Sequence, residues 1–437
     1  MAYMPTTTAE PGKKSKLLRV IGNLTVATIC GLTFGFTAQG FLISMLSGQA
    51  VGARDFVVYW ATGQQLAHHA NPYDREALYR IEHDAGLPKQ FGALFMRNPP
   101  STVLLVYPLG FLSLRVASVV WSLFLLLCFA TSVYIVWLMH GRRKGNRHWI
   151  GYSFAPALIA LLNGQTSLFA LLGLVVFLRL HRTHQFLAGL SLWLCLLKPH
   201  LFLPFGLVML VWIVVTKSYR IILGAALAIA ASCWIAYRID PIAWSQYGQM
   251  VHTSGIQWEF IPCVSVLLRV WFSKGSIWLQ YVPSVVACSW ALYYYWTRRA
   301  KWNWSTHGSL LMLVSIVAAP YCWLFDQALA IPALMRGAYF TRSRNLVIVL
   351  ALLSALVEVA LICNLWKPSA VYLWTLWSAP AWLIWYLVAI NYDRLAAEWP
   401  RWMAKIRPRG AQPEMETMHE AQLSNTSALQ SNEKSGV

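Results

Sequence analysis

The stretch that decides the fold is VIGNLTVATICGLTFGFTAQGFLISML, residues 20–46, which holds no charged side chain. It exceeds the roughly 20 apolar residues that a helix needs to cross the hydrocarbon core of a bilayer. Basic residues come directly before it, at Lys13, Lys14, Lys16 and Arg19. Cationic residues beside a membrane helix favour the cytoplasmic side. No small-residue cleavage site follows a short apolar core, so we expect a retained helix and a cytoplasmic N-terminus.

The rest of the chain repeats this pattern of apolar runs separated by short polar gaps. Of its 437 residues, 58% are hydrophobic and only 12% are charged, whereas soluble domains carry about 25% charged residues. Further apolar runs lie near 116–139, 149–162, 166–180, 185–198, 201–216, 219–237, 278–297, 306–320, 326–338, 345–365 and 370–391. The sequence therefore predicts an all-α polytopic membrane protein, with about twelve crossings within a transmembrane domain at 20–391.

The net charge of +19 is distributed in a way that argues against a nucleic-acid partner. Basic residues recur in the short gaps between apolar runs, which is the positive-inside pattern of membrane proteins. The clusters lie at 13–19, 142–147, 179–182, 217–220, 298–301, 336–344 and 394–409. On this pattern 1–19 and 392–437 are cytoplasmic, the latter as an amphipathic segment with a disordered tail. Residues 49–100 and 238–276 then form the first and second outer loops.

Polar interruptions break several apolar runs that are too short to cross the bilayer alone. They are Asn163-Gly164-Gln165, Lys198-Pro199-His200 and Pro320-Tyr321. Broken helices are tolerated at membrane depth only where they line a cavity or pack on protein. We therefore expect a wet cavity that is open to the outer side of the membrane.

Asp55 is the best-placed acid for chemistry, because apolar and aromatic residues follow it immediately. A carboxylate in such surroundings is partly desolvated and holds a proton more readily. That property suits a general base that takes a proton from a hydroxyl group. A salt bridge with Arg54, or a helix cap for a surface helix at 56–69, explains the residue equally well.

The cations at membrane depth have competing interpretations as well. Lys198 and His200 suit an anionic lipid head group, although Lys198 could simply extend its ammonium group to the interface. Arg97 could contact a phosphate or only help to seat a half-helix at 101–113. Asp326 is a candidate substrate ligand or a helix cap.

Two further regions carry polar residues with open roles. The second outer loop contains His252, Trp258, Glu259 and Arg269, which fit either membrane anchoring or binding of a lipid-linked sugar. Glu358 falls in the middle of an apolar run, where a carboxyl group is costly unless it is paired or protonated. The sequence does not indicate its partner.

An ordered series of motifs resembles glycosyltransferase family 87, a group of membrane enzymes of the GT-C type. The series is Asp55-Phe56-Val57-Val58-Tyr59-Trp60, Asn71-Pro72-Tyr73-Asp74, Asn98-Pro99-Pro100, Tyr107-Pro108-Leu109, Gly164-Gln165 and Leu197-Lys198-Pro199. The family contains α-mannosyltransferases that use polyprenyl-phosphate mannose. The resemblance implies an inverting transferase that moves a sugar, mannose by analogy, from a polyprenyl-phosphate donor to a lipid- or glycan-linked hydroxyl group. It also implies an inner (plasma) membrane protein with its active site on the outer, periplasmic face, without a metal or another cofactor.

The resemblance further implies roles for individual residues. Asp55 would be the catalytic base. The donor phosphate would lie against Lys198, His200, Arg97 and Arg269. The substrate-binding residues would be Tyr59, Asn98, Gln165, Tyr321, Asp326, His252 and Trp258. A polytopic transporter or lipid-sugar flippase is the alternative, and a membrane scaffold without activity is a third.

Overall fold

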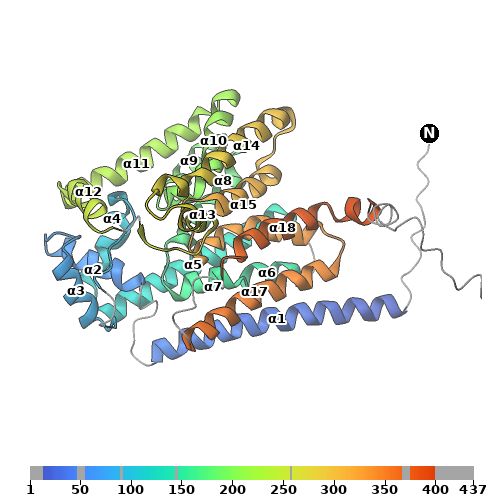
Figure 1. Ribbon diagram of the computed structural model, residues 1–437, viewed down its shortest axis with the longest axis horizontal. Helices are drawn as coiled ribbons and strands as arrows, with labels where there is room; N and C mark the ends of the chain where they lie inside the picture. The colour runs from blue at the N-terminus through green and yellow to red at the C-terminus, as the bar shows by residue number, and fades with distance from the viewer. Residues whose placement is uncertain are drawn as a thin grey trace, which may run out of the picture. The chain divides into compact units, whose positions relative to one another are not determined.

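The computed structural model describes residues 13–46, 55–88, 92–142, 146–255, 258–366 and 375–398, and over these ranges all regular structure is helical (Figure 1). The chain up to Ile390 forms one compact unit, to which the following description applies. The expected salt bridge between Asp55 and Arg54 and most of the expected cytoplasmic tail fall outside the described residues.

Four apolar helices of the described part are long enough to cross a membrane. They are Val20–Ile43 within α1 (Lys13–Leu46), Leu114–Met139 (α5), Pro199–Thr216 with α10 (Leu203–Thr216), and Tyr219–Ile239 (α11). These correspond to apolar runs that the sequence predicts, with ends shifted by a few residues. Most of the remaining runs form shorter helices, although α17 (Arg344–Trp366) has 23 residues, so the structure does not establish the expected count of about twelve crossings.

The remaining helices include breaks at 163–166, 196–198 and 319–323, where the sequence predicts polar interruptions. Their bounds are α6 (Trp149–Tyr152), α7 (Ala155–Leu162), α8 (Ser167–Leu180), α9 (Gln185–Cys195), η4 (Pro199–Phe202), α14 (Val282–Arg298), α15 (Ser309–Ala318), η9 (Leu324–Ala330), α16 (Ile331–Phe340), α17 (Arg344–Trp366) and α18 (Ser378–Ile390). Short single turns lie at η3 (Asn146–His148), η7 (Arg299–Lys301) and η8 (Trp304–Gly308). Helix α9 packs against both α8 and α11.

The first outer loop contains two helices, but α2 (Asp55–Ala67) is not the surface helix that the sequence predicts, because nine of its 13 residues are buried. Helix α3 (Arg75–Asp84) begins after Asp74, whose carboxylate accepts a hydrogen bond from the N–H of Ala77 at 2.8 Å. The predicted half-helix is present as η1 (Pro100–Thr102), α4 (Val103–Val106) and η2 (Tyr107–Phe111). Close backbone contact between Gly63 of α2 and Gly110 of η2 leaves no room for a side chain at either position.

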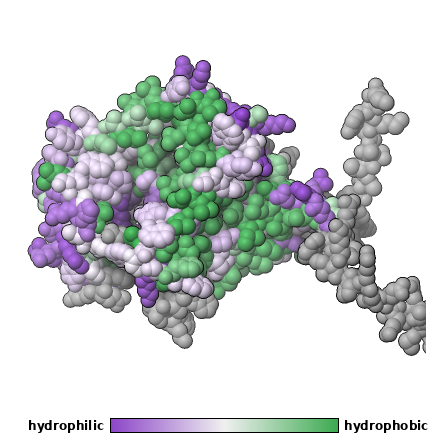
Figure 2. Space-filling model, turned by 45° about the horizontal axis from the view of Figure 1, so that its top comes forward, coloured by the Kyte–Doolittle hydropathy of each residue, from purple (hydrophilic) through white to green (hydrophobic). Residues whose placement is uncertain are grey.

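The second outer loop folds into α12 (Ala243–Thr253), α13 (Val264–Phe272) and η6 (Ile277–Tyr281). Helices α2, α3, α4 and α12 lie together at the left of Figure 1. The basic clusters meet elsewhere, through hydrogen bonds of Arg147 to the carbonyl of Thr341 (2.9 Å) and of Arg182 to that of Trp302 (3.1 Å). Figure 2 shows hydrophilic residues over the α2–α3 end and a broad hydrophobic area beside it, as expected for helices that face lipid.

Glu358 finds its partner in the first helix of the chain. The hydroxyl group of Thr37 on α1 donates to Glu358 Oε1 on α17 at 2.6 Å, and both side chains are buried. A hydrogen-bonded carboxyl group at this depth ties α1 to α17. The two residues are separated by 321 positions, which explains why the sequence does not reveal the pair.

Candidate active site

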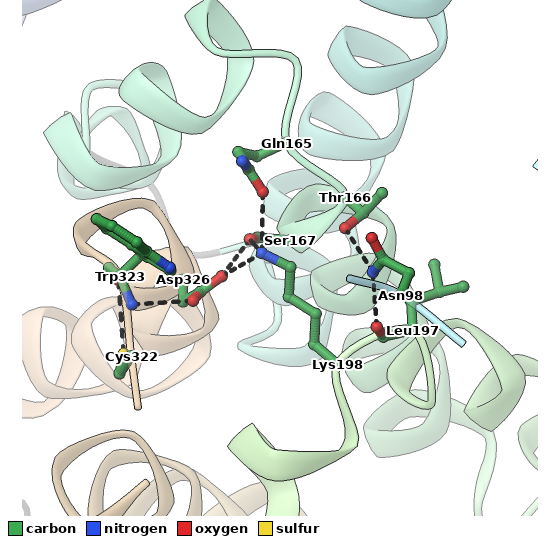
Figure 3. A network of polar contacts seen from close by, with 9 residues as sticks. All are labelled: Asn98, Gln165, Thr166, Ser167, Leu197, Lys198, Cys322, Trp323 and Asp326. Carbon is green, nitrogen blue, oxygen red and sulfur yellow. Dashed lines mark hydrogen bonds and ion pairs between the residues drawn. The ribbon is translucent and has the colours of Figure 1, made fainter. Parts of the chain in front are cut away.

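Lys198 lies at the centre of a buried polar network that joins three distant segments (Figure 3). Its ammonium group donates to Gln165 Oε1 at 2.9 Å, to the Ser167 hydroxyl at 3.0 Å and to Asp326 Oδ1 at 2.6 Å. An ammonium group has three hydrogens. All of them are therefore engaged by the protein, and Lys198 has no donor left for a ligand in this arrangement.

Asp326 is buried and fully engaged as well, with 1% of its surface exposed. Its Oδ1 also accepts a hydrogen bond from the Ser167 hydroxyl at 2.6 Å, and its Oδ2 accepts one from the N–H of Trp323 at 3.0 Å. The second bond closes the first turn of η9. Of the two roles expected for Asp326, substrate ligand and helix cap, the structure therefore shows the capping role. The ion pair between Lys198 and Asp326 holds η9 against the helix break that precedes η4. The Lys198 ammonium group also lies 4.8 Å from the centre of the Phe325 ring.

Asn98 attaches the end of the first outer loop to this network. Its side-chain amide donates to the carbonyl of Leu197 at 2.7 Å and to the Thr166 hydroxyl at 3.4 Å. Both partners are next in sequence to network residues. The Asn98, Gln165 and Lys198 motifs, which the sequence analysis singled out separately, thus meet at one place.

Asp55 lies at the start of α2, beside the turn that contains Gly164. The turn needs glycine, because Gly164 has a φ of +72° and a side chain there would lie 2.8 Å from Cβ of Phe56. Asp55 is partly exposed. One helical turn further on, Tyr59 is buried, and its pKa is raised mainly by burial and then by the negative charges of Asp55 and Asp326. Tyr59 lies four residues after Asp55, on the same face of α2.

Arg97 and Arg269, which the sequence predicts as phosphate-binding residues, contact residues of the second outer loop. Arg269 is buried and donates to the backbone carbonyls of Trp258 at 3.3 Å and of Glu259 at 3.2 Å. Arg97 forms an ion pair with Glu259, and its own carbonyl accepts a hydrogen bond from the Tyr247 hydroxyl at 3.1 Å. Arg97 thus joins the first and second outer loops, whereas Arg269 holds the second loop together.

The other expected site residues divide into a half-buried pair and an exposed pair. His200 stacks on Tyr321 with ring centres 3.8 Å apart, and its Nε2 is buried without a hydrogen-bond partner in the described part of the chain. His252 and Trp258 are exposed, and the structure does not bring them into the Lys198 network. No group of three or more His, Cys, Asp or Glu side chains within the described ranges could hold a metal ion.

Ser167 is a member of the network that the sequence analysis did not select. It connects Lys198 to Asp326, although the sequence gives it only as part of a polar start to an apolar run. Tyr247 is a second omission, because its aromatic ring and hydroxyl group meet Tyr73 and Arg97 across the two outer loops. The polar residues at the start of an apolar helix could have indicated Ser167. No feature of the sequence indicated Tyr247.

A comparison with known protein families identifies the family of this chain. The model of glycosyltransferase family 87 matches residues 95–320. The chain belongs to glycosyltransferase family 87. As a member of this family with apolar helices of membrane-spanning length, the protein is a membrane glycosyltransferase. The match includes Asn98, Gln165 and Lys198, whereas Asp55 and Asp326 lie outside it. No curated protein and no solved structure matches the chain.

Proposed function

We propose that this family 87 enzyme moves a sugar from a polyprenyl-phosphate donor to a hydroxyl group on a lipid- or glycan-linked acceptor, with Asp55 as the general base. By analogy within the family the sugar is mannose. The observation that carries the proposal is the position of Asp55, which is partly exposed at the start of α2, one helical turn before the buried Tyr59.

The proposed reaction is a single displacement. The acceptor hydroxyl attacks the anomeric carbon, Asp55 takes the hydroxyl proton, and the bond between that carbon and the phosphate oxygen breaks through an oxocarbenium-like transition state. The polyprenyl phosphate leaves as an anion, so a general acid is not required. Attack from the face opposite the leaving group inverts the anomeric configuration.

The cations take different parts in this proposal. Because the ammonium hydrogens of Lys198 are all engaged, we assign Lys198 and Asp326 to positioning the Gln165 turn and η9 around the site. Two further groups are better placed to bind the departing phosphate. His200 can donate a hydrogen bond as a neutral ring from a nitrogen that has no partner in the described chain, and Arg97 carries a positive charge and is partly exposed. Arg269 supports them by holding the loop that carries Glu259.

The proposed orientation follows from the distribution of basic residues. We assign the end where Arg147, Arg182 and their neighbours gather to the cytoplasm, and the end with α2, α3 and α12 to the periplasmic face of the inner membrane. The short helices would then pair end to end to complete the remaining crossings, up to about twelve in total.

The donor test separates the proposal from its main alternative. Membranes that contain the protein should transfer label from radioactive polyprenyl-phosphate mannose. They should fail to use GDP-mannose once synthesis of the prenyl-linked sugar is blocked. Use of GDP-mannose under that block would contradict the proposal. A flippase would instead move the labelled lipid across the bilayer without forming a new glycosidic bond.

A further inference from the structure

A polar groove crosses the first outer loop beside the candidate active site. It consists of two adjoining hollows of about 590 and 480 Å³ that share Arg75, Gly92 and Ala93. One hollow extends along α3 to Arg80, and the other extends to Arg97. We call these hollows together the outer groove. Their walls come from α3, the segment 92–97 and the end of α12.

The charges of the outer groove are unusual for their side of the membrane. Basic residues of this chain gather in the gaps assigned to the cytoplasm, whereas Arg75, Arg80 and Arg97 lie on the opposite side. Glu259 neutralises Arg97. Neither Arg75 nor Arg80 has an ion-pair partner among the described residues, and Glu76 is the only acid that lines the hollow along α3. The groove therefore offers guanidinium groups that are available to an anion.

The groove leads from the candidate active site to a point further out. At its inner end Arg97 directly precedes Asn98, which is bound to the Lys198 break through the Leu197 carbonyl. The two hollows join at Arg75, which begins α3 after the end of α2, and the hollow along α3 extends from there to Arg80. The 13 residues of α2 correspond to about 20 Å of helix. A ligand in the groove that also reaches Asp55 must therefore be extended.

We propose that the outer groove binds an anionic group, a phosphate or a carboxylate, on an extended acceptor glycan. Arg75 and Arg80 hold that group, because guanidinium forms paired hydrogen bonds with both kinds of anion. The exposed ring of Tyr79, which lines the same hollow, presents an apolar surface to the glycan. The acceptor role rests on the proposed function, whereas anion binding by the two arginines does not.

Binding is measured on the full chain in phosphatidylcholine nanodiscs, with glucose 6-phosphate, glucose and inorganic phosphate as probes. We expect glucose 6-phosphate to bind at least ~10-fold more tightly than glucose. Arg75→Gln and Arg80→Gln should each weaken that binding by about tenfold and leave glucose binding unchanged. Lys274→Gln is the matched control, because Lys274 is exposed in the second outer loop and does not line the groove.

A second arm assigns the anion to the acceptor. Glucose 6-phosphate should inhibit transfer in competition with the acceptor and not with the lipid donor. Equal binding of glucose and its phosphate, or unchanged binding in both arginine variants, overturns the inference. Loss of glucose 6-phosphate binding when phosphatidylglycerol is added to the nanodiscs overturns the acceptor role, because a lipid head group then occupies the site. Anion binding without any transfer activity would refute the proposed function and leave the anion site standing.

Discussion

The buried ion pair between Lys198 and Asp326 allows a quantitative prediction. Asp326→Asn leaves an ammonium group in a site where the side chain of Lys198 is only 10% exposed, and Lys198→Met leaves a buried carboxylate. Removing one partner of a buried pair costs about 3–5 kcal/mol. For a large domain 1 kcal/mol corresponds to about 2 °C in Tm, so each variant should unfold about 6–10 °C below the wild type.

The free cysteines of the chain provide the assay. Cys195 and Cys322 are buried and react with a fluorogenic thiol dye only when the protein unfolds. The double variant Lys198→Met, Asp326→Asn carries no buried charge, and its Tm should drop by clearly less than the sum of the two single drops. Additive drops in the double variant would refute the reasoning, because they would show that the two charges do not depend on each other.

Two further predictions concern the turn at Gly164 and the first outer loop. Gly164→Ala should destabilise the protein by about 1–3 kcal/mol and reduce the rate of sugar transfer, because a left-handed backbone is strained for alanine and the new Cβ would meet Phe56. Gly248→Ala is the control and should have neither effect, because nothing lies within 4 Å of its Cβ position. Burial raises the pKa of Glu82 from 4.5 to about 7, so the folded protein keeps a proton that the unfolded chain releases. Stability should therefore fall as the pH rises from about 4.5 to 7, and Glu82→Gln should flatten this slope in thermal unfolding across that range. The same slope in that variant would show that other groups cause it.

The helices were largely predictable because apolar runs report burial in lipid directly. The run predicted at 116–139 is α5 at Leu114–Met139, and the half-helix predicted at 101–113 is present as η1, α4 and η2. The polar breaks were also predictable as places where the chain turns. Hydropathy alone could not give the number of crossings, because short helices can span a membrane only in combination with neighbours.

The partners of the polar residues could not be predicted, because they come from distant parts of the chain. Lys198 and Asp326 are separated by 128 positions, and each separately looked like a free ligand group. Once paired, they satisfy each other and are no longer open to substrate. Arg75 and Arg80 were overlooked for the opposite reason, since they lie on an ordinary surface helix and only the folded loop places them along a groove.

Replacement of Asp55 tests the central claim most directly, with Asp74→Asn as the matched control. Asp74 is a second acid at the start of an outer helix, and asparagine caps a helix as well as aspartate does. With saturating polyprenyl-phosphate sugar, Asp55→Asn should lower kcat by a factor of about 10²–10⁴ while donor binding is retained, because only the proton acceptor is lost. Asp74→Asn should keep the wild-type rate. Turnover by Asp55→Asn at a rate close to that of Asp74→Asn would contradict the assignment of Asp55 as the base.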